Sequence, residues 1–105
     1  MRKFKKYYTI KYNGETLDVT QGEYIGGKRI SLQATIHETG EPYSVLTTNI
    51  PAYDKDFPNK KFIIIDSNNN PGIADVLIKA GLIDKQCITL VQSGYCVYPV
   101  YKWLG

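Results

Sequence analysis

The stretch F-I-I-I-D-S-N-N-N-P-G-I-A-D-V-L-I-K-A-G, residues 62–81, marks the point where the apolar pattern of the chain changes from that of a strand to that of a helix. Residues 62–65 form a short, continuously apolar run, which is typical of a strand covered on both faces. Beyond it, apolar side chains follow the i, i+3, i+4, i+7 spacing of a helix at Ile73, Val76, Leu77 and Ala80. Gly81 is well placed to end that helix. Helical spacing occurs nowhere else in the sequence, so we predict one helix, around residues 71–81.

The polar residues of this stretch raise the question of a ligand loop, because Asp66, Asn68 and Asn70 carry side-chain oxygens at alternate positions. A calcium loop beginning at Asp66 would need glycine at its sixth position and glutamate at its twelfth. Those positions hold Pro71 and Leu77. A phosphate loop is excluded as well, since no Gly-Lys-Ser or Gly-Lys-Thr sequence is present. We therefore expect no metal or phosphate at this loop.

Helix capping is the better interpretation of these polar side chains. As the N-cap, Asn70 would accept hydrogen bonds from the free amides of the first turn, with Pro71 at the first helical position. Asp75 would lie near the positive end of the helix dipole. The turn before the helix would be held by side-chain to main-chain hydrogen bonds from three further residues, Asp66, Asn68 and Asn69.

Elsewhere the dominant period is two, which is the period of a strand. In residues 30–37 apolar side chains alternate with polar ones, and Asn13-Gly14 is a strong hairpin signal. Further strand-like segments cover residues 8–12, 16–20, 22–25, 43–50, 62–65, 87–91 and 95–103, while residues 52–59 are predicted to form a loop. One helix among these strands predicts an α+β fold, with a curved, mostly antiparallel sheet of about six to seven strands and the helix packed on one face.

The size and composition of the chain fit one small globular unit. With 105 residues, 43% of them apolar and 22% charged, we predict a single domain over residues 1–105. The chain has nine tyrosines and only one methionine. Tyrosine combines a large contact area with a polar end, so this excess suits exposed sheet faces and interfaces.

The charge is mildly basic, at +3, and five basic residues fall among the first twelve with no acid between them: Arg2, Lys3, Lys5, Lys6 and Lys11. Such an end is suited to nucleic acid or to an acidic protein surface, although a solvated terminus is the simpler interpretation. No apolar signal segment is visible, and no run approaches the roughly 20 apolar residues of a membrane span. We therefore expect no membrane contact and a cytoplasmic location.

The candidates for catalysis are few. Cys87 and Cys96 lack CxxC spacing and His37 is the only histidine, whereas zinc needs three or four such ligands, so we expect no metal and no cofactor. A small cysteine enzyme would use Cys96 as nucleophile, His37 as base and Asp66 to orient the base. Cys96 follows Tyr95 in a strand-like run, however, and not at a helix N-terminus that would lower its pKa. We expect a structural thiol, a surface histidine and no enzymatic activity.

Aromatic residues gather near the C-terminus, where Tyr95, Tyr101 and Trp103 share one parity of the predicted strand. Both faces of that strand are apolar or aromatic, so it is either central or has a face available to a partner. Together with the basic N-terminus, such a surface could stack single-stranded bases. The sequence has no RNP-like or KH-like pattern, and a nucleic-acid-binding accessory protein of a mobile element is kept as an alternative.

Four segments resemble an uncharacterised family of short phage, plasmid and bacterial proteins: P-Y-S-V-L-T-T-N-I-P at 42–51, I-D-S-N-N-N-P-G at 65–72, G-L at 81–82 and Q-S-G-Y-C-V-Y-P-V-Y at 92–101. The chain also resembles the small type II anti-CRISPR proteins, which inhibit Cas9. This resemblance implies a non-enzymatic anti-defence protein in the cytoplasm of a bacterial host. Its partner would be Cas9 or the Cas9–guide RNA complex.

With ten acidic residues and a net positive charge, the chain is poorly suited to DNA mimicry, which requires an acidic surface. An inhibitor of this kind would bind through an aromatic and basic patch and block DNA engagement or the step that licenses cleavage. The residues that we expect to contact the partner lie in the basic end, in the long loop and in the C-terminal strand: Lys5, Lys6, Tyr7, Tyr53, Asp54, Asp56, Tyr95 and Tyr101.

Overall fold

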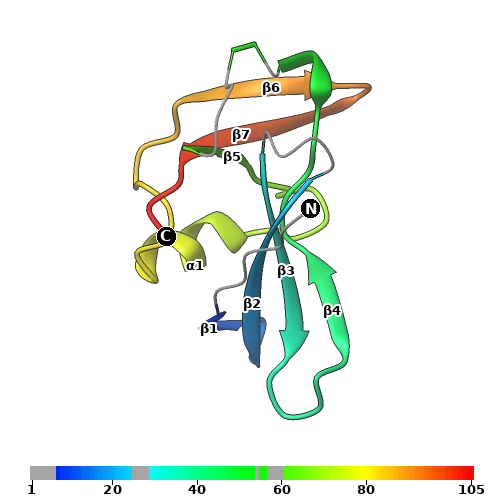
Figure 1. The fold of residues 1–105 in the computed structure, drawn as a ribbon, viewed down its shortest axis with the longest axis vertical. Coiled ribbons are helices and arrows are strands. Elements are labelled where there is room, and N and C mark those ends of the chain that lie inside the picture. The colour runs from blue at the N-terminus through cyan, green and yellow to red at the C-terminus, as the bar shows by residue number, and fades with distance from the viewer. Residues whose placement is uncertain (1–6, 25–28, 54, 57–60) are drawn as a thin grey trace.

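A computed structural model describes residues 7–24, 29–53, 55–56 and 61–105, and this part of the chain contains seven strands and one α-helix (Figure 1). A four-stranded antiparallel sheet has the order β1 (Tyr7–Tyr12), β2 (Glu15–Glu23), β3 (Ile30–Ile36) and β4 (Pro42–Val45). A three-stranded antiparallel sheet has the order β5 (Phe62–Ile64), β7 (Cys96–Lys102) and β6 (Thr89–Ser93). The predicted α+β class is confirmed, with the strands divided between two sheets.

The four-stranded sheet follows the alternation seen in the sequence. The β1–β2 hairpin turns at Asn13 and Gly14, which both have positive φ, 52° and 79°, as a tight two-residue turn requires. On β2 and β3 the core face carries the buried Leu17, Val19 and Leu32. The opposite face is polar, so one side of this sheet is core and the other faces water, as predicted.

The chain crosses from one sheet to the other directly after β4. Residues 46–48 leave the first sheet and lie along the outer side of β5, where Thr48 N donates to Ile64 O at 3.1 Å and Asp66 N donates to Leu46 O at 2.9 Å. Strand β5 ends its sheet in the strand order, but this crossing segment covers its outer edge. Ile63 and Ile64 are therefore fully buried, as the continuous apolar run predicted.

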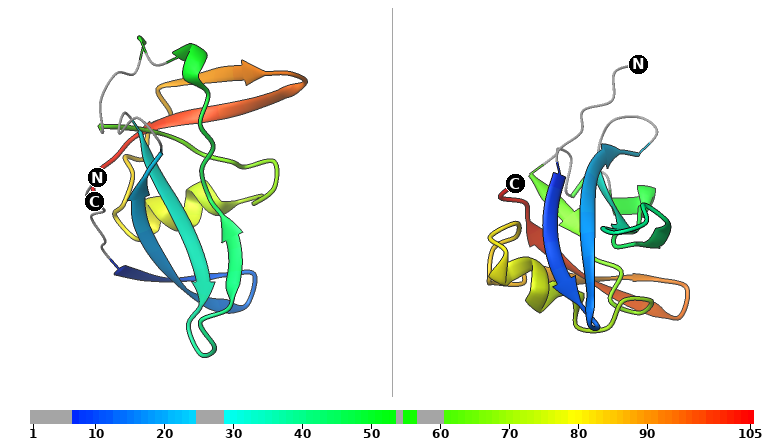
Figure 2. Two further views of the ribbon diagram at one scale, coloured as in Figure 1. Left: turned by 45° about the vertical axis from the view of Figure 1, so that its right-hand side comes forward. Right: turned by 90° about the horizontal axis from the view of Figure 1, so that it is seen from below.

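Two apolar clusters form the core. The larger one joins the four-stranded sheet to the helix α1 (Ile73–Lys79) and includes Ile10, Leu17, Val19, Leu32, Ile63, Ile73, Leu77, Leu82 and Trp103. The smaller one lies on the other face of the three-stranded sheet, under the 3-10 turn η1 (Pro51–Tyr53), and consists of Ile50, Ile64, Val91 and Val100. Figure 2 shows α1 beside β1 and below the three-stranded sheet. Within the described residues, no helix has the length and apolar character needed to cross a membrane.

The start of the helix differs from the prediction. The helix begins at Ile73 and its N-cap is Gly72, with φ of 78° and no side-chain cap bond, so Asn70 is not the N-cap. The Asn70 side chain is buried and instead donates to Val45 O at 2.9 Å and to Asp66 O at 3.1 Å. Asp66 was predicted to hold the turn before the helix by a side-chain to main-chain hydrogen bond. It does so, because its Oδ1 accepts from Asn69 N at 3.2 Å.

The junction between the sheets also partly buries Tyr24. The Tyr24 hydroxyl lies 2.8 Å from Thr47 Oγ1, and burial raises the Tyr24 pKa above its ordinary value of 10.0. Because the folded-state pKa is the higher one, the stability contributed by Tyr24 is complete below the unfolded pKa and is lost as the pH rises through the folded pKa.

We therefore expect Tyr24→Phe to be less stable than wild type by about 1 kcal/mol near neutral pH, and this gap to narrow above about pH 10. Urea unfolding of both proteins across this pH range measures the gap. If the difference in unfolding free energy between wild type and Tyr24→Phe stays constant through the alkaline range, the raised pKa assigned to Tyr24 is wrong.

Candidate functional site

Exposed apolar side chains are concentrated on one element, the β6–β7 hairpin. Of the six large apolar side chains that are exposed among the described residues, four belong to this hairpin or its entry: Ile88, Leu90, Tyr95 and Val97. Tyr95 at the tip is fully exposed, and Leu90 is 63% exposed. Contiguous exposed apolar surface of this kind marks interaction sites more often than isolated exposed residues do.

The strand register places Leu90, Val97 and Pro99 on one face of the hairpin, and Tyr95 lies in the turn at its tip. Leu90 pairs with Pro99 and Gln92 pairs with Val97, and directly opposed residues in an antiparallel pair point to the same side. The neighbouring pair, Val91 and Tyr98, points to the opposite side, where Val91 packs into the smaller core cluster. We call Leu90, Tyr95, Val97 and Pro99 the hairpin surface.

The hairpin carries no charged side chain before Lys102, at the end of β7. Residues 86–101 are sixteen consecutive positions without Asp, Glu, Lys or Arg, although 22% of the whole chain is charged. The centres of protein interfaces are depleted of charged residues and enriched in aromatic ones. An exposed, uncharged and partly aromatic face therefore has the composition of a protein-binding surface.

Polar contacts from two distant segments hold the hairpin in place. The loop after β5 supports β7, since Asn68 Nδ2 donates to Val97 O at 3.2 Å and Ile65 N donates to Pro99 O at 3.0 Å. On the other side, the Tyr53 hydroxyl contacts the main chain of Gln92 in β6. The hairpin extends past these supports, away from α1 (Figures 1 and 2).

The structure places the predicted contact residues in different environments. Tyr95 stands exposed at the hairpin tip, and Tyr53 lies half-buried against the smaller core cluster with its hydroxyl at β6. Asp56 is exposed close to Tyr53, to whose carbonyl its amide donates. Tyr101 is half-buried against the larger core cluster, and burial raises its pKa. Lys5, Lys6 and Asp54 lie outside the described residues, and Tyr7 is described only by its main chain.

Sequence reasoning missed Leu90 and Val97 as candidate contact residues. Leu90 lies in the segment 87–91, which was predicted only as a strand, and Val97 lies in the C-terminal strand, for which only the aromatic residues were considered as contacts. The signal that could have identified them is the uncharged run at 86–101, because an ordinary surface hairpin of this length would carry charged residues.

The cysteine hydrolase arrangement is not assembled. His37 Nδ1 lies 2.9 Å from Asp18 Oδ1 beside the four-stranded sheet, whereas Cys96 is in β7 of the other sheet and Asp66 holds its own loop. Cys87 and Cys96 are free thiols near opposite ends of the hairpin. Among the described residues, no group of three or more His, Cys, Asp or Glu side chains is placed to hold a metal ion.

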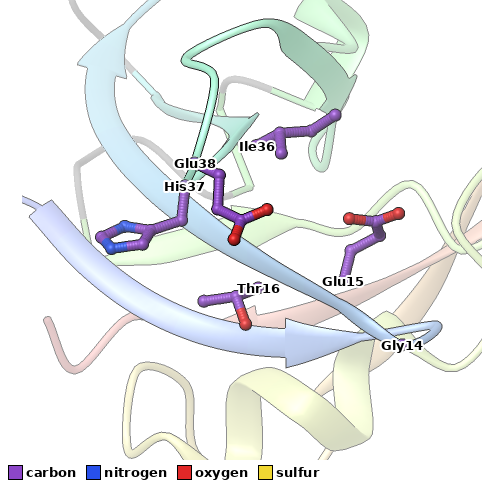
Figure 3. Close-up of a pocket in the computed structure, with 6 residues that line it drawn as sticks. All are labelled: Gly14, Glu15, Thr16, Ile36, His37 and Glu38. Carbon is purple, nitrogen blue, oxygen red and sulfur yellow. The ribbon is translucent and has the colours of Figure 1, made fainter.

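A separate cavity lies beside His37 at the end of the four-stranded sheet. It measures about 310 Å³ and is lined by Gly14, Glu15, Thr16, Ile36, His37 and Glu38 (Figure 3). Neither cysteine lines it, and the two carboxylates project from different turns. The cavity therefore lacks the cysteine that the hydrolase arrangement would need beside the imidazole.

Comparison with protein-family models, curated proteins and solved structures finds no match to this chain. Three of the segments that carry the family resemblance nevertheless meet in the structure. The loop at 65–72 bonds the 42–51 segment through Asn70 and Val45, and bonds the 92–101 segment through Asn68 and Val97. These three segments thus form one structural unit that ends in the hairpin surface.

Proposed function

We propose that this protein is a non-enzymatic inhibitor of a type II Cas9 nuclease, produced by a phage or another mobile element and acting in the bacterial cytoplasm. The hairpin surface would dock onto the folded nuclease or its guide-RNA complex. The observation that carries the binding role is the exposed, uncharged apolar face of the β6–β7 hairpin. The choice of Cas9 as the partner rests on the resemblance of the chain as a whole to the small type II anti-CRISPR proteins.

The chemistry of the hairpin surface indicates the kind of site it would fit. Leu90, Val97 and Pro99 offer an apolar strip, and the fully exposed Tyr95 can insert its ring while its hydroxyl forms a hydrogen bond. Apolar and aromatic anchors dominate the affinity of most interfaces, whereas contacts at the rim contribute little. An apolar groove on the nuclease therefore suits this surface better than its DNA-binding channel, which is strongly basic.

A titration of the protein into cleavage reactions by several Cas9 orthologues tests this function. We expect cleavage by at least one orthologue to stop at a near-stoichiometric ratio, because a non-enzymatic inhibitor must occupy each nuclease molecule. Undiminished cutting by every orthologue at large molar excess would remove the proposal. A gel shift with free nucleic acid tests the alternative role, that of a nucleic-acid-binding accessory protein. Such a protein would bind free nucleic acid, and its affinity would fall steeply with salt because it contacts phosphates.

A further inference from the structure

The outer edge of β6 is the second unusual feature of the hairpin. The strand order β5-β7-β6 leaves this edge without a neighbouring strand in the sheet. The main-chain groups of Gln92 point away from β7, since both its N and its O lie 3.3–3.4 Å from the Tyr53 hydroxyl. Those of Leu90 point the same way, because its partner Pro99 has no N–H and turns its carbonyl to Ile65.

The other described strand edges each have a feature that discourages pairing with another chain. The edge strand β1 carries Lys11 and packs beside α1, and β4 begins with Pro42 opposite a bulge in β3. The outer edge of β5 is covered by residues 46–48. Charges, proline, bulges and covering segments are the usual means by which edge strands avoid association. Strand β6 has no charge and no proline, and the contact that the described residues make with the main chain of its outer edge comes from the Tyr53 hydroxyl.

We propose that β6 pairs with β6 of a second copy of this chain, in antiparallel orientation about a two-fold axis at Val91. Leu90 of each copy then lies opposite Gln92 of the other, and the two three-stranded sheets join into one continuous sheet of six strands. In such an isologous contact the same surface meets itself, so any charge near the axis would meet a like charge. The uncharged run at 86–101 removes that repulsion.

Tyr53 occupies the position of the incoming strand. Its hydroxyl contacts both the N–H and the C=O of Gln92, which are the groups that an added strand would bond. Pairing therefore requires the Tyr53 hydroxyl to leave the edge, and loss of this hydroxyl favours the dimer.

This dimer is independent of the proposed function. Edge pairing uses the main chain of β6 and leaves the apolar face open, so two copies of the hairpin surface would lie side by side on one sheet. Absence of the dimer would leave the binding of a nuclease by a single copy unaffected.

Sedimentation velocity over a range of concentrations tests the proposal. Wild type should sediment as a dimer at high concentration and dissociate on dilution. Gln92→Pro removes an edge N–H that makes no bond to β7, so it should fold and raise the dimer dissociation constant about tenfold or more. Gln92→Ala keeps that N–H and serves as the matched control, with wild-type association expected.

Tyr53→Phe is the second variant and acts in the opposite direction. Without the hydroxyl the edge is open, so the dimer should form at several-fold lower concentration than in wild type. Circular dichroism confirms that each variant is folded before it is compared. A wild type that stays monomeric at all concentrations, or a Gln92→Pro variant that associates as wild type does, would overturn the proposal.

Discussion

Replacing Leu90 and Val97 together by lysine should abolish binding to the nuclease that the protein inhibits. The two side chains are diagonal neighbours on the hairpin surface and both are exposed, so the substitutions put two charges into the proposed interface. Burying an unpaired ammonium group is strongly unfavourable. We expect affinity to fall by about 100-fold or more, which corresponds to about 2.7 kcal/mol. Biolayer interferometry with the nuclease–guide RNA complex measures this loss of affinity.

A matched control separates this local effect from a general effect of added charge. Thr9 and Gln33 are exposed on the four-stranded sheet, and replacing both by lysine adds the same charge away from the hairpin. This control should bind as wild type does. Both double variants should also unfold within about 0.5 kcal/mol of wild type, since all four positions are exposed. Equal loss of binding in the two variants would contradict the assignment of the hairpin surface.

Asn70→Ala should cause a large loss of stability, about 2 to 3 kcal/mol, although it removes only one small polar side chain. The Asn70 amide is buried and bonds the carbonyls of Val45 and Asp66, while its oxygen accepts from Ser44 Oγ at 2.7 Å. Its removal takes away three side-chain hydrogen bonds, one buried and two part-buried, and leaves a gap where the buried Asn70 amide joined two segments of the chain. The midpoint of urea unfolding reports the loss.

Asn69→Ala is the appropriate comparison for this prediction. Asn69 is the neighbouring amide, but it is exposed and its side chain bonds only within its own loop, to Asp66 Oδ2 at 2.8 Å. We expect Asn69→Ala to lower the free energy of unfolding by about 1 kcal/mol or less. If the two substitutions destabilise the protein equally, the role of Asn70 as the link between the 42–51 and 65–72 segments is wrong.

The elements that depend on local pattern could be predicted from the sequence. Residues 73–79 form the helix because Ile73 and Leu77 fall on one face, and the Asn13-Gly14 turn follows from two residues that tolerate positive φ. The capping role of Asn70 could not be judged in the same way. The rule for N-caps considers only neighbouring amides, whereas Ser44 and Val45 lie 26 and 25 positions away and compete for the same side chain.

The candidate site could be predicted only in part, for a similar reason. Tyr95 was identified from the aromatic pattern, and the sequence also indicated that both faces of the C-terminal strand are apolar. Which of the two faces is covered depends on Ile50 and Tyr53, which pack on the Val91 side from a distant segment. Because periodicity carries no information about such long-range covering, periodicity alone did not distinguish Leu90 and Val97 from core residues.

Hydrogen–deuterium exchange is the most direct test of the hairpin surface as the binding site. The protein would be measured alone and in complex with a nuclease whose cleavage it stops, and amide protection compared along the chain. The proposal predicts that protection on binding is greatest over residues 88–99, with little change in the β1–β2 and β3–β4 hairpins. Protection confined to the four-stranded sheet, with exchange in residues 88–99 unchanged, would contradict it.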